Sequence, residues 1–241
     1  MKYELSVITV CLNDYSNLAK TLESIKKQKF KMEYIIVDGN SNDGSKQLLE
    51  NEISWIDHLI IEKDKGLYDA MNKGVLKSSG EWIMFLNAGD VFDNNQVLQK
   101  IFNSRNLIKN NDIVFGDTKV MHENGEENYI EAGSLKNIDY GMQFSHQSML
   151  VRKNLQNKYL YNLNFKYAAD YDFILNSFYN KKNFGRFRGP IAKMSTNGVS
   201  DINRIPVLKE WLHISKKKSF KGVLIMLIKL LFQYFKKLLK I

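Results

Sequence analysis

Short apolar runs alternate with amphipathic segments in the N-terminal part of the chain. The runs end at turn-forming or acidic residues and are expected to form strands at 5–12, 34–37, 58–62 and 82–86. The segments between them repeat apolar positions at helical spacing, at 18–25, 46–52 and 67–77. Alternation of this kind is typical of a mostly parallel sheet flanked by helices, so the pattern predicts an α/β fold.

The second part of the chain mixes further strands and helices. Strands are expected at 112–116, 148–152 and 184–194, and helices at 97–102 and 168–175, with a polar loop at 195–201. Asn124-Gly125 is a strong turn signal, which predicts a hairpin over residues 117–133.

The run from Trp82 to Leu86 is apolar without a break and then stops at Asn87, Gly89 and Asp90. A strand of this kind is buried on both faces. Its carboxyl end is where open α/β sheets bind ligands, and Asp90 there could hold a divalent metal against a diphosphate. The alternative is a strand that ends in a solvated turn.

Polar side chains also follow the other strands. The set at the strand ends is Asn13, Asp38, Asp43, Asp64, Asn87 and Asp90. Carboxylates and amides at one edge of a parallel sheet fit a nucleotide diphosphate with a bridging metal. The chain has no Gly-x-x-x-x-Gly-Lys loop, and no Gly-x-Gly-x-x-Gly follows the first strand, which disfavours ATPases and dinucleotide dehydrogenases.

The net charge of +9 is unevenly distributed. Residues 204–241 carry ten Lys and Arg side chains and one acid, Glu210, so residues 1–203 are neutral overall. A nucleic-acid-binding protein more usually carries positive charge on its folded domain, so we expect no nucleic-acid partner. We predict a globular domain at 1–203 and a basic helical tail at 204–241.

The tail is expected to lie on a membrane surface. Its longest uninterrupted apolar run, Val223 to Ile228, is too short to span a bilayer. Lysines and Gln233 fall along one helical stripe beside a wide apolar face, which is typical of an in-plane helix on anionic lipid, here residues 216–241. The alternatives are a helix docked on the globular domain and a homodimer interface. One cysteine, Cys11, and a first strand without a preceding signal sequence predict a cytoplasmic location at the inner face of the membrane.

Five segments, taken in order, resemble the family 2 glycosyltransferases, and more narrowly the bacterial members that build surface polysaccharides. These segments are 6–13, 35–45, 64–74, 80–90 and 146–148, and the resemblance covers about residues 4 to 200. It implies a GT-A fold and an inverting, metal-dependent transfer of sugar from a nucleotide-sugar, often UDP-linked, to a saccharide acceptor. The tail makes a lipid-linked acceptor the expected one.

The resemblance also implies roles for individual residues. Asp38 matches the carboxylate that pairs with the nucleobase, Asn13 lies beside the nucleotide, and Asp64 fits the next contact with the nucleoside or sugar. Asn87 to Asp90 takes the place of the metal-binding motif, which makes Asp90 the ligand of Mn²⁺ or Mg²⁺. His146 falls in the donor and acceptor pocket.

Asp170 matches the family's candidate general base. The sequence departs from the family pattern at three places: Gly39 replaces a second Asp, Asn87 and Gly89 replace carboxylates, and Ala169 replaces a Glu. The last departure leaves Asp170 and Asp172 as alternatives for the base, and both also suit the first turn of a helix.

Two other functions remain open at this point. A nucleotidyltransferase should carry a Gly-rich, Lys- or Arg-containing loop after the first strand, which residues 13–16 do not resemble. A non-catalytic nucleotide-sugar-binding protein at the membrane would fit the reduced number of acids in the metal motif.

Overall fold

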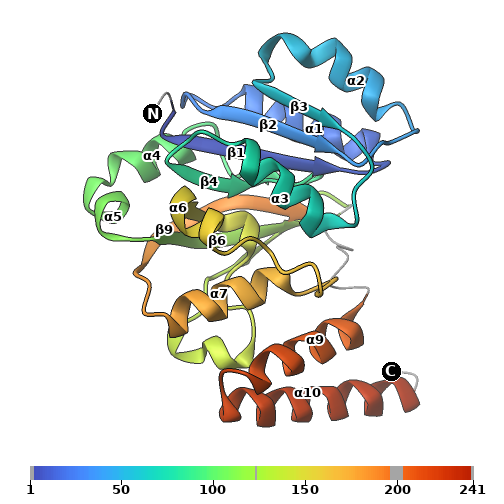
Figure 1. Cartoon of the computed structure of the whole chain (residues 1–241), viewed down its shortest axis with the longest axis vertical. Coiled ribbons are helices and arrows are strands. Elements are labelled where there is room, and N and C mark those ends of the chain that lie inside the picture. The colour runs from blue at the N-terminus through green and yellow to red at the C-terminus, as the bar shows by residue number, and fades with distance from the viewer. Residues whose placement is uncertain (1–2, 123, 196–202, 240–241) are drawn as a thin grey trace. The chain divides into compact units, whose positions relative to one another are not determined.

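The computed structural model describes residues 3–122, 124–195 and 203–239 (Figure 1). These residues form two compact units. The first unit takes its residues from 1–132, 144–161 and 182–196, and the second from 133–143, 162–181 and 197–241. The predicted functional boundary at 203/204 stays a prediction, and the compact units divide the chain differently.

The first unit is built on one mixed sheet, whose strands follow the order β3-β2-β1-β4-β8-β6-β9-β5, with β7 paired to β6. The strands are β1 Leu5–Cys11, β2 Glu33–Asp38, β3 His58–Ile61, β4 Trp82–Phe85, β5 Val91–Phe92, β6 Ile113–Met121, β7 Glu127–Ile130, β8 Met149–Arg152 and β9 Phe184–Ser195. The half formed by β1 to β4 is parallel. β8 then joins β4 antiparallel, and β6 joins β8 antiparallel.

Helices cover both faces of this sheet. They are α1 Tyr15–Lys26, α2 Ser45–Glu52, η1 Ile53–Trp55, α3 Leu67–Lys77, α4 Val97–Asn103, α5 Arg105–Asn110, η3 His146–Ser148 and α6 Lys153–Lys158. α1 buries Leu18, Leu22 and Ile25 in the same core cluster as Leu5 and Val7 of β1. The alternate residue of β1, Ile8, meets α3, where a Cβ added to Gly74 would lie 2.5 Å from Ile8 Cγ2. All seven residues of β1 are buried, and successive side chains point to opposite faces of the sheet, so one helix packs against each face.

The predicted strands and helices of this unit are confirmed, and so is the hairpin, formed by antiparallel β6 and β7. Helices α5 and α6 were not expected from the sequence, because their six-residue segments are too short to show a helical repeat. The loop expected at 195–201 lies outside the described residues except for Ser195.

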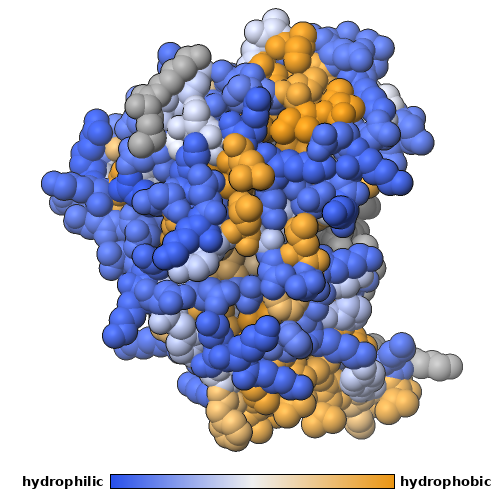
Figure 2. Space-filling model, in the orientation of Figure 1, coloured by the Kyte–Doolittle hydropathy of each residue, from blue (hydrophilic) through white to orange (hydrophobic). Residues whose placement is uncertain are grey.

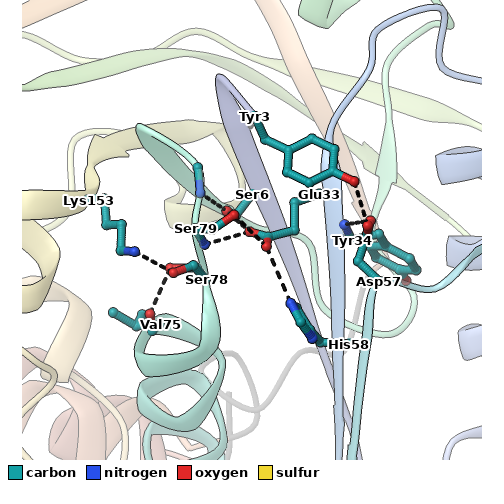
Figure 3. Close-up of polar contacts among 11 residues, drawn as sticks. Tyr3, Ser6, Glu33, Tyr34, Asp57, His58, Val75, Ser78, Ser79 and Lys153 are labelled. Carbon is teal, nitrogen blue, oxygen red and sulfur yellow. Dashed lines mark hydrogen bonds and ion pairs between the residues drawn. The ribbon is translucent and has the colours of Figure 1, made fainter. Parts of the chain in front are cut away.

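A buried carboxylate links neighbouring segments at the amino ends of the parallel strands (Figure 3). Glu33, at the start of β2, accepts hydrogen bonds from the Ser6 hydroxyl and from the backbone N–H and hydroxyl of Ser79, both Ser79 distances being 2.7 Å. His58 of β3 lies 3.5 Å away. These bonds hold the pKa of Glu33 below its ordinary value although burial opposes the shift. The charged group therefore ties together β1, β2 and the turn before β4.

The second unit is helical. It contains η2 Leu135–Tyr140, α7 Ala169–Tyr179, α9 Arg204–Lys216 and α10 Phe220–Leu238. α9 and α10 run side by side (Figure 1). They approach closely at Gly222, where an added Cβ would lie 3.0 Å from Ser215 Oγ. The Trp211 ring of α9 lies 5.0 Å from the Tyr171 ring of α7, so the helices share one core.

α10 has two different apolar faces. Met226 and Leu230 are buried within the second unit. The opposite face exposes large apolar side chains, visible as the orange strip over α10 in Figure 2: Phe220, Leu224, Leu227, Ile228, Leu231, Phe232, Phe235 and Leu238. Within the described part of the chain no helix is long and apolar enough to cross a membrane. One face of α10 is therefore docked within the second unit, which the sequence analysis gave only as an alternative, while the other apolar face is uncovered.

The lysines of α10 do not all belong to one solvent-facing stripe. Lys229 turns inward and donates a hydrogen bond to the backbone carbonyl of Tyr140 in η2. Burial, together with the charge of Arg204, lowers the pKa of Lys229. Lys221, Lys236 and Lys237 are exposed.

Candidate functional site

The parallel half of the sheet brings the predicted site residues of the first unit to one edge. Cys11 at the end of β1 pairs with Asp38 at the end of β2, and Asp38 pairs with Ile61 at the end of β3. On the other side of β1, the backbone N–H of Ala88 donates to the carbonyl of Val10. The segments that follow β1, β2, β3 and β4 therefore start side by side, as the alternating pattern predicts.

Asp38 is fully buried and orders the loop after β2. Its Oδ1 accepts the Ser41 backbone N–H at 2.7 Å, and its Oδ2 accepts the Ser41 hydroxyl at 2.6 Å. Ser41 Oγ in turn accepts the N–H of Asn13, and Asn13 Oδ1 accepts the N–H of Asn42. Each Asp38 oxygen keeps a lone pair beyond its bond to Ser41. Asp38 and Asn13 thus form one hydrogen-bonded loop cluster.

Gly39 explains one departure from the family pattern. A Cβ at Gly39 would lie 2.5 Å from Asp64 Oδ2 and 3.2 Å from Leu12 Cδ1. Asp64 itself accepts the Gly66 N–H with its other oxygen, at 2.8 Å. The absence of a side chain at 39 therefore lets the Asp64 carboxylate lie against the backbone next to Asp38.

Asp43 also lies at this edge, where it forms hydrogen bonds with nearby backbone and side-chain groups. Its Oδ2 accepts the N–H of Tyr15 at the start of α1, and its Oδ1 accepts the hydroxyl and N–H of Ser45 at the start of α2. These bonds hold the pKa of Asp43 below its ordinary value. The Asp43 carboxylate therefore links the first residues of α1 and α2 through hydrogen bonds.

The segment after β4 is a tight turn. The Asp90 N–H donates to the Asn87 carbonyl at 2.9 Å, and Gly89 at the third position has a φ of +93°. A positive φ at this position favours Gly, as in a type II turn. Thr21 of α1 stabilises the turn, because its hydroxyl donates a hydrogen bond to the Asp90 carbonyl and accepts one from the Gly89 N–H. The turn places the Asp90 side chain with little freedom.

The Asp90 carboxylate is buried, with the residue 6% exposed. Burial raises its pKa to about 7, while His146, a hydrogen bond from the Gln147 side chain and the backbone of Asn87 act in the opposite direction. A carboxyl group whose pKa is raised toward neutral pH by burial is typical of functional sites.

Asn87 and His146 join Asp90 in one cluster. Asn87 Nδ2 lies 3.3 Å from His146 Nε2. Asn87 Oδ1 is buried and has no hydrogen-bond partner in the described residues. The orphaned amide oxygen of Asn87 and the carboxylate of Asp90 are oxygen donors of the kind that Mn²⁺ and Mg²⁺ bind when a ligand supplies further oxygens. The described residues contain no group of three or more His, Cys, Asp or Glu side chains that could bind a metal by themselves.

Asp170 belongs to the second unit, in the first turn of α7 together with Asp172. Asp170 Oδ1 accepts the N–H of Tyr171 at 2.8 Å. Burial raises the pKa of Asp172, while a hydrogen bond from Asn176 and the charges of Lys217, Lys218 and His213 oppose this. Asp172 is therefore in the electrostatic field of the end of α9.

Two residues that help to build the site were not selected from the sequence: Thr21 and Ser41, which hold the turn and loop that carry Asp90 and Asp38. Gln147, which belongs to the segment 146–148 selected from the sequence, hydrogen-bonds Asp90. The Asp-x-x-Ser spacing of Asp38 and Ser41 is a usable turn signal. Thr21 lies in an ordinary helical pattern and gives no such signal.

Solved structures with this fold are GT-A glycosyltransferases. Residues 1–349 of S. aureus TarS, in complex with UDP-GlcNAc, superpose with a TM-score of 0.68 at 17% identity, over 97% of this chain and 73% of that one. The mannosyltransferase PcManGT from Pyrobaculum calidifontis, in complex with GDP-Man and Mn²⁺, superposes with a TM-score of 0.66 at 12% identity, over 95% and 70%.

The sequence gives the family directly. The model of glycosyl transferase family 2 matches residues 6–193, and the chain belongs to this family. A PGL/p-HBAD biosynthesis glycosyltransferase of Mycobacterium bovis is 29% identical over 212 residues, which cover 86% of this chain and 82% of the relative. Glycosyltransferase AglE of Haloferax volcanii is 33% identical over 102 residues, which cover 40% of this chain and 33% of the relative. The protein is a glycosyltransferase with the GT-A fold.

Proposed function

We propose that the protein transfers a sugar from a UDP-sugar to a hydroxyl of a lipid-linked saccharide, with inversion, during synthesis of a bacterial surface polysaccharide. The observation that carries the proposal is the cluster at the carboxyl end of β4, in which buried Asp90 and Gln147 lie beside partly buried Asn87 and His146. It lies at the same sheet edge as Asp38 and Asp64, so a nucleoside and its diphosphate fit along one line of strand ends.

The nucleoside end of the donor is assigned to the loops after β1, β2 and β3. Asp38 accepts donors of the base through its remaining lone pairs, Asn13 borders the nucleotide, and Asp64 accepts a ribose or sugar hydroxyl. UDP is the proposed nucleotide because TarS, solved with UDP-GlcNAc, is 17% identical to this chain, whereas PcManGT, solved with GDP-Man, is 12% identical.

Asp90 and the unpartnered Oδ1 of Asn87 would hold a divalent metal, Mn²⁺ or Mg²⁺, and His146 borders the donor beside them. When bound, the metal neutralises negative charge on the leaving diphosphate. The orphaned Asn87 oxygen supports this assignment, and so does Mn²⁺ in PcManGT, a protein of the same fold. With one protein carboxylate in the cluster, most remaining ligands would come from the donor's diphosphate.

Asp170 is the proposed general base. It accepts the proton of the acceptor hydroxyl while that oxygen forms a bond to C1 of the sugar and the bond from C1 to the diphosphate oxygen breaks, with inversion at C1. Burial raises the pKa of Asp172, the alternative, while Asn176, Lys217, Lys218 and His213 act in the opposite direction. Asp170 is preferred because it is the residue that matches the base of the family pattern.

The exposed face of α10 is the proposed membrane contact, which would hold the enzyme at the cytoplasmic face near a lipid-linked acceptor. Phe220 is 87% exposed and Leu231 70% exposed, which is unusual for such side chains in water. Exposed lysines at both ends of the helix, Lys216 to Lys218 and Lys236 to Lys237, complement anionic headgroups. A second copy of the chain is the competing occupant.

The proposed activity is tested by screening nucleotide-sugars for hydrolysis and for transfer to a soluble acceptor, with Mn²⁺ and with a chelator. We expect UDP release from one UDP-sugar that rises with Mn²⁺ and with acceptor. Release of pyrophosphate from UTP and a sugar 1-phosphate, assayed in parallel, would indicate nucleotidyl transfer. Binding of UDP-sugars without turnover, with every acceptor class tried, would indicate a non-catalytic binding protein.

A further inference from the structure

α9 begins at Arg204, beyond the segment that matches the family, yet it contacts the stretch of chain that leads into Asp170. This stretch, residues 165–171, ends in the first turn of α7 and belongs with α9 to the second unit. Three side chains of α9 contact it: Glu210, Trp211 and His213.

Glu210 holds the backbone immediately before α7. Its Oε1 accepts the N–H of Lys166, and its Oε2 accepts the N–H of Tyr167, both at 2.8 Å. Hydrogen bonds from backbone N–H groups to a carboxylate are roughly twice as strong as neutral ones. Two of them on consecutive residues fix both the position and the direction of the chain as it enters the helix.

Trp211 holds the other side of Asp170. Its ring lies 5.0 Å from that of Tyr171, which is fully buried and donates its hydroxyl to the Ile138 carbonyl at 3.1 Å. The Trp211 ring also packs on Gly141, where an added Cβ would lie 2.2 Å from it. Asp170 is therefore flanked by two contacts made by neighbouring residues of α9.

We propose that Glu210 and Trp211 are positioning residues for Asp170, so that α9 is part of the catalytic apparatus as well as the support of α10. The inference rests on the proposed function, in which Asp170 is the base. A base must lie within hydrogen-bond reach of the hydroxyl, and a misplacement of about 1 Å can cost about 100-fold in rate. This role also accounts for the one acid in an otherwise basic tail.

The test compares Glu210→Ala, Glu210→Gln and Trp211→Phe with Lys209→Ala, an exposed neighbour on the same helix, in the whole 241-residue chain. We expect Glu210→Ala to lower kcat for transfer by about 10-fold or more, with the donor KM and UDP affinity within about twofold of wild type. Glu210→Gln keeps one acceptor oxygen and should recover part of the loss. Lys209→Ala should behave as wild type.

Several results would overturn the inference. One is wild-type kcat in Glu210→Ala. Another is a loss of kcat that only follows the fraction of folded protein, measured by circular dichroism, with no recovery in Glu210→Gln. Asp170→Asn, assayed in parallel, distinguishes failure of the proposed function from failure of this inference. Wild-type turnover in Asp170→Asn would contradict the assignment of Asp170 as the base. An inactive Asp170→Asn beside a fully active Glu210→Ala would contradict only the role of α9.

Discussion

The side-chain amide of Asn87 lies 3.3 Å from the imidazole of His146, although 59 residues separate them in sequence. Asn87 follows β4, and His146 opens η3, which leads into β8. Because β8 runs antiparallel to β4, its amino end meets the carboxyl end of β4. The cluster around Asp90 is therefore assembled by the change of strand direction in the middle of the sheet.

Asp90→Asn is expected to stabilise the unliganded fold and to weaken Mn²⁺-dependent UDP binding. The pKa of Asp90 is raised to about 7 in the folded protein, against about 3.9 in an unfolded chain. Between these values the folded state binds more protons, so stability falls as the pH rises. The neutral amide removes this cost, and we expect a gain of about 1 to 4 kcal/mol at pH 8 that vanishes near pH 4. Urea unfolding at both pH values measures it, and equal stability of the two proteins at pH 8 would contradict the prediction.

Asp170→Asn should abolish transfer, with a loss of about 100-fold or more, and leave UDP affinity nearly unchanged. Asp172→Asn serves as the matched comparison two residues away and should retain transfer within about threefold, because the proposed base is Asp170. Single-turnover assays and calorimetric UDP titrations distinguish the effects. The reverse ranking of the two variants would assign the base to Asp172.

Glu33→Gln should destabilise the fold by about 1 to 3 kcal/mol, because the amide presents a donor to hydroxyl and N–H groups that now donate to a carboxylate. The lowered pKa of Glu33 gives the sign of the pH effect. Its contribution is complete above the unfolded value of about 4.3 and is lost as the pH falls through the folded one, so the variant should show a shallower loss of stability in acid. Glu126→Gln, on the exposed hairpin, is the control. A variant with wild-type acid sensitivity would show that Glu33 is not the group responsible.

Replacement of Leu224, Leu231 and Phe235 by Gln should release the protein from anionic vesicles while the fold remains intact. This change is sharper than deletion of residues 216–241, because deletion also removes Met226 and Leu230 from a buried face. Lys236→Gln should weaken binding about fivefold, whereas Lys229→Gln, which changes an inward-facing lysine, should not. Vesicle sedimentation measures binding. A triple variant that binds vesicles normally but changes from dimer to monomer in sedimentation analysis would assign the face to a second copy.

The sequence predicts best what depends on local pattern. Alternating apolar runs place Asp38, Asp64 and Asp90 at strand ends, and the parallel sheet then brings those ends together. The contacts of Ser41 and Thr21 depend on loop conformation and helix placement, which no short pattern encodes. The inward turn of Lys229 shows the same limit, because the helical wheel of α10 gives the lysine stripe but not the side on which η2 packs.

The position of β4 between a parallel and an antiparallel neighbour has an evolutionary consequence. Substrate-recognising side chains can be contributed by segments that enter the sheet as well as by segments that leave it. The segment before β8 can then diversify around His146 without altering the loops after β1 and β2. Under the proposed assignment of the nucleoside to those two loops, a lineage can in this way change the sugar it handles and keep its nucleotide.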